Sequence, residues 1–206
     1  MAIATGLRDH WQWRPEWASD RPCLLWYLTF PHQAALWRLA ERVHARVHGV
    51  RTVDVVPLQW LHLTLDDVGF VDELTPGQVE DVVESVHAAV EGWRVPPITL
   101  GPVTTTVGAL VLRAAPEAEL GQLRDRLRAS TGAVLGPDAA SGLGGFWPHV
   151  TLAYSNDACD RRTVMEPLGI VSSDQVVVAA PQLTLAAATR RNRHYQWTAR
   201  SVIPLT

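Results

Sequence analysis

One six-residue pattern occurs twice in this chain and constrains its fold more than any other feature. It stands at residues 60–65 as WLHLTL and returns at residues 147–152 as WPHVTL. In both copies Trp, His and Thr alternate with apolar residues. Successive side chains of a β-strand point to opposite faces, so the alternation puts Trp, His and Thr on one face. The sequence therefore predicts two equivalent strands, each with an imidazole and a hydroxyl on the same side.

These residue types suit phosphate chemistry. The pairs are His62 with Thr64 and His149 with Thr151. Two such strands side by side could hold an anionic group between two imidazoles. One neutral imidazole can take a proton from water or a ribose hydroxyl, while the other, protonated, gives one to the leaving oxygen. The hydroxyls can donate hydrogen bonds to the non-bridging oxygens, so no metal ion is needed.

A purely structural interpretation competes with this one. A single histidine on a strand is usually a hydrogen-bonded structural group, and threonine is common in strands for its branched shape. Four residue types repeated at identical offsets nevertheless favour a functional pair. A third similar stretch, residues 183–185, is preceded by Gln182 and has no histidine at the matching place, so it is interpreted as an ordinary strand.

Composition limits the class of protein. The chain has 206 residues, of which 47% are hydrophobic and 19% charged, which predicts one compact unit and excludes a disordered chain. A net charge of −3 argues against long duplex nucleic acid as a partner. Cys23 and Cys159 are the only cysteines, too few for a disulfide framework or a zinc cage. We therefore expect two buried thiols in a cytoplasmic protein, and no apolar run is long enough to predict a membrane span.

Residues 1–21 are predicted to form an N-terminal arm. It contains Trp11, Trp13 and Trp17, and no helical or strand periodicity fits it. These tryptophans either pack on the body of the protein or form an aromatic lip over a base-binding cleft, because nucleobases stack on such rings. The sequence leaves both alternatives open.

Residues 22–206 are predicted to form a single bilobal domain of mixed strands and helices. Strands are expected at residues 23–30, 53–56, 60–70, 98–103, 107–112, 146–154, 175–188 and 194–204, and helices at residues 31–48, 75–92, 116–131 and 160–168. Each half carries one His-x-Thr strand. This order favours an α+β fold with two pseudo-symmetric lobes, each a β-sheet with helices on its outer side, around a central cleft.

Three further groups of residues have open or ordinary interpretations. His44 and His48 have the spacing of metal ligands but lack a third ligand, which favours a surface role. The turn at residues 189–193 is the tight positive cluster of the chain, and its Arg191 and Arg193 either contact phosphate or keep a hairpin tip soluble. A solvated helix face is predicted for Arg124, Arg126 and Arg128.

The paired motifs resemble those of the two-histidine phosphoesterase superfamily, which includes 2′-5′ RNA ligase-like proteins and cyclic phosphodiesterases. The resemblance extends from about Pro22 to Leu205 and leaves the tryptophan-rich start outside. It implies a bilobal fold with a central cleft and metal-independent action on 2′,3′-cyclic phosphates or 2′-5′ linkages, without a cofactor. Carried over to this chain, it makes His62 and His149 the acid/base pair and the threonines two residues after them, Thr64 and Thr151, the phosphate-binding hydroxyls.

The prediction is therefore an enzyme, a metal-independent phosphodiesterase that hydrolyses 2′,3′-cyclic phosphates of nucleotides or RNA ends. The alternatives are a 2′-5′ phosphodiesterase or RNA 2′-5′ ligase, a non-catalytic nucleotide- or RNA-binding protein and, last, a metallohydrolase. Trp60 and Trp147 share the strand faces of their histidines and are expected to flank the cleft as substrate contacts. We expect a monomer that works without a membrane or long duplex nucleic acid.

Overall fold

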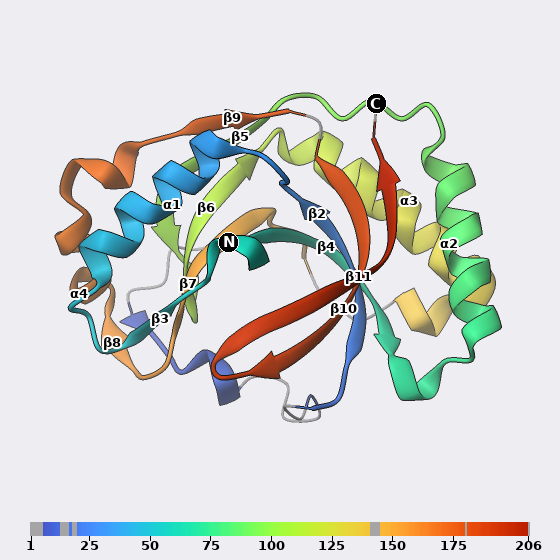
Figure 1. The fold of residues 1–206 in the computed structure, drawn as a ribbon, viewed down its shortest axis with the longest axis horizontal. Helices are drawn as coiled ribbons and strands as arrows, with labels where there is room; N and C mark the ends of the chain where they lie inside the picture. The colour runs from blue at the N-terminus through green and yellow to red at the C-terminus, as the bar shows by residue number, and fades with distance from the viewer. Residues whose placement is uncertain (1–5, 13–16, 18–19, 141–144, 180, 206) are drawn as a thin grey trace.

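The structure is a computed structural model and describes residues 6–12, 17, 20–140, 145–179 and 181–205. Within these residues the chain forms one large curled antiparallel sheet with helices packed on it (Figure 1). A separate two-stranded sheet pairs β1 (Gly6–Leu7) with β8 (Cys159–Asp160). The arm is thereby attached to the second half of the chain.

The strands of the large sheet follow the order β11-β10-β2-β4-β7-β6-β5-β9, and β3 also pairs with β7. Their bounds are β2 (Cys23–Thr29), β3 (Val53–Val55), β4 (His62–Phe70), β5 (Ile98–Thr105), β6 (Ala109–Ala115), β7 (His149–Ser155), β9 (Val176–Val178), β10 (Gln182–Arg191) and β11 (His194–Pro204). The motif strands β4 and β7 are central neighbours. The predicted α+β fold with two lobes is confirmed, and the two lobes share one continuous sheet.

The lobes are not the two halves of the sequence. Strands β10 and β11, from the C-terminal end, join β2 and β4, whereas β5 and β6 join β7. The prediction of a single strand at residues 175–188 is therefore wrong, because two strands in different lobes take its place. This segment is interrupted before Pro181, whose ring nitrogen has no hydrogen to donate to a sheet ladder. Strand β9 consequently pairs with β5 at one edge, and β10 pairs with β2 in the other lobe.

The helices cover the lobes. Helices α2 (Pro76–Val90) and α3 (Glu117–Leu135) pack together, with α3 against β4, on the right of Figure 1. Helix α1 (Ala34–Val47) packs on β7 and β9 of the other lobe, next to the short α4 (Arg161–Met165) and the 3₁₀ segment Glu166–Ser173. The expected apolar stripe of α1 is fully buried: Leu36, Leu39, Ala40, Val43 and Val47. Within the described chain no helix is both long and apolar enough to cross a membrane.

Two cysteines occupy different environments. Cys23 is buried at the start of β2, whereas Cys159 lies in the small β1–β8 sheet and is partly exposed, so the prediction of a buried thiol is wrong for Cys159. Within the described residues neither forms a disulfide, and the Cys23 thiol donates to the Leu24 carbonyl at 3.8 Å.

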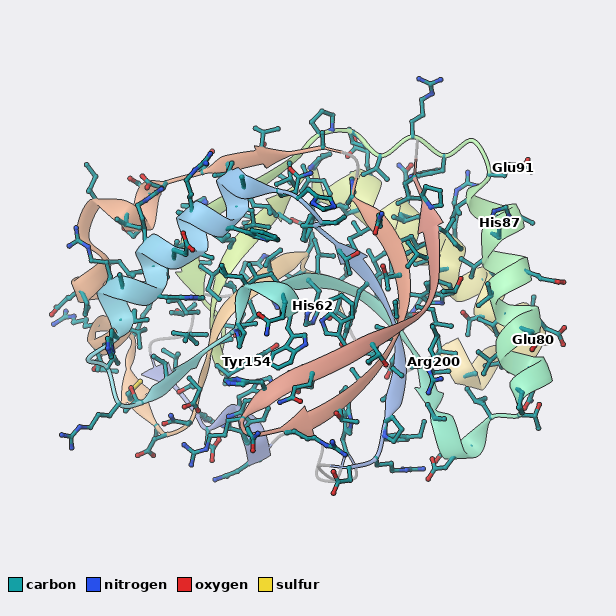
Figure 2. All side chains as sticks on the ribbon, in the orientation of Figure 1. His62, Glu80, His87, Glu91, Tyr154 and Arg200 are labelled. Carbon is teal, nitrogen blue, oxygen red and sulfur yellow. The ribbon has the colours of Figure 1, made fainter. Side chains whose placement is uncertain are left out.

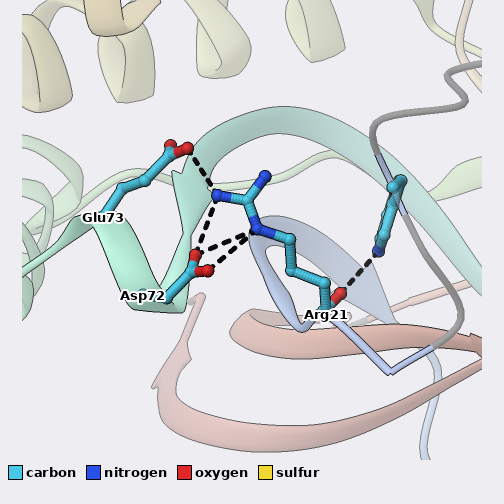
Figure 3. A network of polar contacts seen from close by, with 4 residues as sticks. Arg21, Asp72 and Glu73 are labelled. Carbon is cyan, nitrogen blue, oxygen red and sulfur yellow. Dashed lines mark hydrogen bonds and ion pairs between the residues drawn. The ribbon is translucent and has the colours of Figure 1, made fainter.

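Arg21 fixes the junction between the arm and β2. Its guanidinium binds the carboxylates of Asp72 and Glu73 in the 3₁₀ turn that follows β4 (Figure 3). The guanidinium carbon also lies 3.6 Å from the centre of the Phe70 ring. The Trp17 indole donates a hydrogen bond of 3.0 Å to the carbonyl of Arg21 and is only 4% exposed. Trp17 therefore packs on the body of the protein, as one of the two interpretations of the arm expects, while Trp13 lies outside the described residues.

A stability prediction follows from the start of α2. The Thr75 hydroxyl accepts a hydrogen bond from the Gln78 amide, and the Gln78 side chain accepts one from the Thr75 amide. Thr75→Ala should lower the free energy of unfolding by about 1 kcal/mol, because it leaves helix donors without partners. Urea unfolding measures the change. Thr163→Ala, at an exposed position within α4, is the control, and equal loss in both variants would contradict the capping role.

Candidate active site

The two motif strands meet at one residue pair. Leu63 of β4 is the antiparallel partner of Val150 of β7, and both side chains are fully buried. In this register each motif histidine lies opposite the threonine of the other strand, at a Cβ separation of about 4.5–5.5 Å for directly paired residues. The two histidines are then diagonal neighbours. All four polar motif residues line one cavity of about 120 Å³: His62, Thr64, His149 and Thr151.

Both histidines are oriented by the same hydrogen bond. The Nδ1 of His62 lies 2.6 Å from the carbonyl oxygen of Trp60, and the Nδ1 of His149 lies 2.7 Å from that of Trp147. A carbonyl oxygen can only accept, so Nδ1 carries the proton in each ring. Nε2 is therefore the atom that can accept or donate a proton. Figure 2 shows the His62 ring near the middle of the molecule, in the space that the curled sheet encloses.

Burial keeps both imidazoles neutral in the ligand-free protein. It lowers the pKa of His62 to about 4, partly opposed by the Trp60 carbonyl, and the charge of His149 lowers it further. Burial also lowers the pKa of His149, against its bond to the Trp147 carbonyl. Protonation of one ring disfavours protonation of the other. An anion in the cavity would reverse this effect, since a nearby negative charge favours the imidazolium form.

Two aromatic rings hold the His62 imidazole in place. The Tyr27 ring stacks on His62, with ring centres 3.9 Å apart and planes 21° apart, and Trp197 meets the same imidazole edge-on at 6.4 Å. The Trp197 indole also donates a hydrogen bond of 3.4 Å to the Trp60 carbonyl, which already accepts from His62. These contacts restrict the orientation of the His62 ring.

The two motif tryptophans do not have equivalent positions. Trp147 lies 5.3 Å from His149, between ring centres, and lines a second cavity beside the histidines. Trp60 lines neither cavity and contacts His194 instead, so the prediction that it flanks the cleft is wrong. The reason is local: residues Leu58–Trp60 form a 3₁₀ turn and β4 begins only at His62, so the strand alternation does not reach Trp60.

A larger cleft of about 650 Å³ adjoins the small cavity. Four residues line both spaces: His10, Thr64, Thr106 and His149. The cleft extends between the arm, the β5–β6 turn and the residues before β7, among them Phe146 and Trp147. The candidate site thus consists of a small pocket at the histidines and a larger space that opens from it.

Tyr154 is a site residue that the sequence pattern did not reveal. Thr151 pairs with Val111 and Ala153 with Leu110, so Leu152 is an extra residue in β7, a β-bulge. A bulge shifts the alternation of a strand by one residue. Tyr154 therefore lines the cavity together with Thr151, although an unbroken alternation would turn it away.

His10 and Tyr195 also line the small cavity and were missed, because nothing in their local sequence has a period or motif. The His10 Nε2 lies 2.9 Å from the Tyr195 hydroxyl, which also accepts a hydrogen bond of 3.1 Å from the Nε of Arg190. Arg190 is only 7% exposed. Burial, together with the charge of Arg190, lowers the pKa of His10 to about 3, so its ring is neutral.

The two arginines proposed as phosphate contacts lie elsewhere. Arg191 and Arg193 sit at the tip of the β10–β11 hairpin, where Arg191 pairs with Asp20 at 2.8 Å and Arg193 with Asp54 at 3.7 Å. Neither lines the small cavity or the cleft, which corrects their assignment as substrate contacts. Side-chain alternation along β10 buries Arg190 and exposes its neighbour Arg191.

The prediction of a solvated arginine face on α3 is wrong for two of its three members. Arg124 is 6% exposed and lies 3.8 Å from Asp66, and Arg128 binds the same carboxylate at 3.0 Å. Burial raises the pKa of Asp66 to about 6 in spite of these two cations. Arg126 is exposed and lies over the Trp93 ring.

The His44–His48 pair does not form a metal site with other residues. The His44 Nε2 bonds to the Leu152 carbonyl at 3.1 Å. Among the residues that the structure describes, no cluster of three or more His, Cys, Asp or Glu side chains is arranged to hold a metal ion.

Comparison with known proteins gives a family and several similar folds. The sequence model described as the 2′-5′ RNA ligase superfamily matches residues 32–190. A comparison with curated proteins gives no match. TT0787 of Thermus thermophilus is 21% identical, with a TM-score of 0.63, over 89% of this chain and 97% of its own.

Escherichia coli LigT has a similar fold as well. Its apo form is 19% identical with a TM-score of 0.59, and the form complexed with 3′-AMP is 19% identical with a TM-score of 0.56. Each covers 91% of this chain and 99% of its own. At these identities the likeness is one of fold.

The environment of the histidines predicts a response to inorganic phosphate. Phosphate should raise the pKa of both His62 and His149, because a bound anion stabilises the imidazolium form that burial disfavours. Nitrogen-15 NMR titration of the imidazoles, with and without phosphate, measures these values. His44, which lines a different pocket, is the internal control. Motif histidines that titrate identically with and without phosphate would contradict an anion site between them.

Proposed function

The chain belongs to the 2′-5′ RNA ligase superfamily, and from this premise we propose that it is a metal-independent phosphodiesterase that hydrolyses 2′,3′-cyclic phosphates of nucleotides or RNA ends. The observation that carries the proposal is the pair of histidines in one cavity, each held through Nδ1 with Nε2 left for proton transfer. A protein that only binds nucleotides has no need for two such groups. A cytoplasmic setting is part of the proposal, since the chain's two cysteines are too few for a disulfide framework.

Nucleotide ligands are proposed from the fold likeness. E. coli LigT has been solved with 3′-AMP, ATP, NADP⁺ and phosphate. In the present chain the cyclic phosphate would occupy the small cavity, where the hydroxyls of Thr64 and Thr151 can donate to its non-bridging oxygens.

Hydrolysis requires one proton acceptor and one proton donor. In the proposed reaction water attacks phosphorus and gives a proton to one Nε2, while the bond between phosphorus and one ribose oxygen breaks and that oxygen takes a proton from the other Nε2. The product is a nucleoside monophosphate. Each proton-transfer group contributes roughly 10²–10⁴-fold to the rate.

The adjoining cleft suggests which histidine is the acid. A ribose is too large for the small cavity beside its phosphate and must extend into the cleft, which His149 lines and His62 does not. The leaving ribose oxygen would then lie on the side of His149. We accordingly assign His149 as the general acid and His62 as the general base that activates water.

Substitution of either histidine tests the activity. His62→Ala and His149→Ala should each lower kcat/KM for a 2′,3′-cyclic nucleotide by at least about 10²-fold, because each removes one proton-transfer group. With bis(4-nitrophenyl) phosphate, whose leaving group needs no proton, His149→Ala should lose far less than His62→Ala. The control is His87→Ala, on the exposed face of α2 (Figure 2). Near-full activity of either motif variant would overturn the proposal. Loss of wild-type activity in EDTA that is restored by adding a divalent ion would also overturn it.

The lowered pKa values set the pH dependence. The reactive form of the free enzyme has His62 neutral and His149 protonated. As pH rises, kcat/KM should first increase near pH 4, where His62 loses its proton. It should then decrease where His149 loses its proton, at a pH below the ordinary histidine pKa of 6.5. The maximum of kcat/KM should therefore lie below pH 6.5. The falling limb of kcat should lie at higher pH, because the bound phosphate stabilises the imidazolium form. Initial rates from pH 3.5 to 8.5 provide the measurement, and a kcat/KM profile without a maximum below pH 6.5 would contradict this assignment.

A further inference from the structure

The size of the small cavity leaves most of a nucleotide unaccounted for. About 120 Å³ accepts a phosphate group, whereas pockets for whole small ligands measure roughly 300–1,000 Å³. The adjoining cleft of about 650 Å³ is of that size, and the two spaces share four lining residues. A nucleotide whose phosphate lies at the histidines therefore has an adjoining space of suitable size for its nucleoside.

One wall of this cleft is an aromatic surface. Trp147 and Phe146 line it, directly before β7. The Arg124 guanidinium lies 5.1 Å from the Phe146 ring centre and lines the same cleft. Aromatic side chains of this kind are the usual stacking partners of nucleobases.

Another wall comes from the arm. Arg8, Asp9, His10 and Gln12 line the cleft, although all of them lie outside the family match at residues 32–190. The Asp9 carboxylate accepts hydrogen bonds from the Trp11 amide at 2.9 Å and from the Gln12 side chain at 3.2 Å. An amide side chain has both donors and acceptors, which the edge of a base requires.

The arm is held in this position by several contacts. Leu7 is buried in the small β1–β8 sheet, the Arg8 amide donates to the Val107 carbonyl at 2.7 Å, and His10 bonds to Tyr195. The His10 ring also packs on Tyr154, with centres 4.4 Å apart. The arm therefore has a defined position beside the histidines, next to the tip of the β10–β11 hairpin (Figure 1).

Gly108, in the β5–β6 turn, leaves the space for His10. A Cβ atom at this position would lie 3.0 Å from the Nδ1 of His10 and 3.3 Å from its Cβ. Contacts this short require one of the two segments to move. The position of His10 thus depends on the absence of a side chain at residue 108.

From these contacts we propose that residues 6–12 and the aromatic pair Phe146–Trp147 form a nucleobase subsite beside the two-histidine cavity, with His10 as the specificity-determining residue that fixes the arm. The inference rests on the proposed function for the location of the phosphate. Its ligand class is a purine or pyrimidine base carried by a ribose phosphate. The His10 ring is neutral, which suits a wall that faces an uncharged base.

The test compares 3′-AMP with inorganic phosphate as ligands of the full chain, by isothermal titration calorimetry. His10→Ala, Gly108→Ala and Trp147→Ala should each weaken 3′-AMP binding by about 10-fold or more. Gly108→Ala, at a residue that lines the cleft and not the small cavity, should weaken phosphate binding much less. Gly49→Ala is the matched control for the glycine change, since a Cβ there has no atom within 4 Å. Its binding should equal that of the wild type.

The double variant His10→Ala/Gly108→Ala separates the arm from a general effect on folding. Both changes act through the same contact. The fold-loss of 3′-AMP affinity in the double variant should therefore be smaller than the product of the fold-losses in the two single variants. Variants that bind 3′-AMP like the wild type, or a Gly108→Ala variant that loses phosphate binding to the same extent as 3′-AMP binding, would overturn the subsite. Because binding is the readout, a wild-type protein that binds 3′-AMP through the arm but fails to hydrolyse cyclic nucleotides would overturn the proposed function alone.

Discussion

The pairing of Leu63 with Val150 is the constraint on which the candidate site depends. Within the described chain it is the one residue pair that joins the motif strands in the sheet, and it has both side chains fully buried. Because the side-chain period of a strand is two, a slip of one residue in either strand would turn its histidine and threonine toward the core. The buried leucine and valine therefore determine where the polar residues point, and the apolar half of each motif matters as much as the polar half.

Burial has two opposing consequences for each imidazole. Packed neighbours orient the rings, namely the Trp60 carbonyl, Tyr27 and Trp197 at His62 and the Trp147 carbonyl at His149, but burial also lowers both pKa values below the ordinary 6.5. A ring that is neutral in the empty cavity can act as a base at once, whereas an acid must first gain a proton. The anionic ligand is the group that makes this proton gain favourable. If the proposed function holds, the acid of this site gains its proton only when the phosphate is bound.

Prediction from sequence succeeded where a pattern depended on local periodicity alone. The repeated alternation identified strands β4 and β7 and the four residues that share the cavity. It failed where the chain departs from regular geometry, at the 3₁₀ turn before His62 and at the bulge of Leu152 that brings Tyr154 to the cavity. It also failed for Arg124. This residue is buried on α3 beside Asp66 of β4, and the sequence of the helix alone does not reveal a partner on another element.

The arm illustrates the same limit and shows where specificity can reside. Trp17 packs on the body of the protein and lines the small cavity, whereas the side chains that the arm contributes to the larger cleft are those of Arg8, Asp9, His10 and Gln12. The described part of the arm therefore does not place a tryptophan over the larger cleft. No periodicity reveals such a segment, since its position depends on Val107, Gly108 and Tyr195, which are distant in sequence. The histidines lie at the starts of two central strands of the sheet, whereas the arm and the residues before β7 lie outside these strands. Reaction chemistry and base selection would then belong to different parts of one chain.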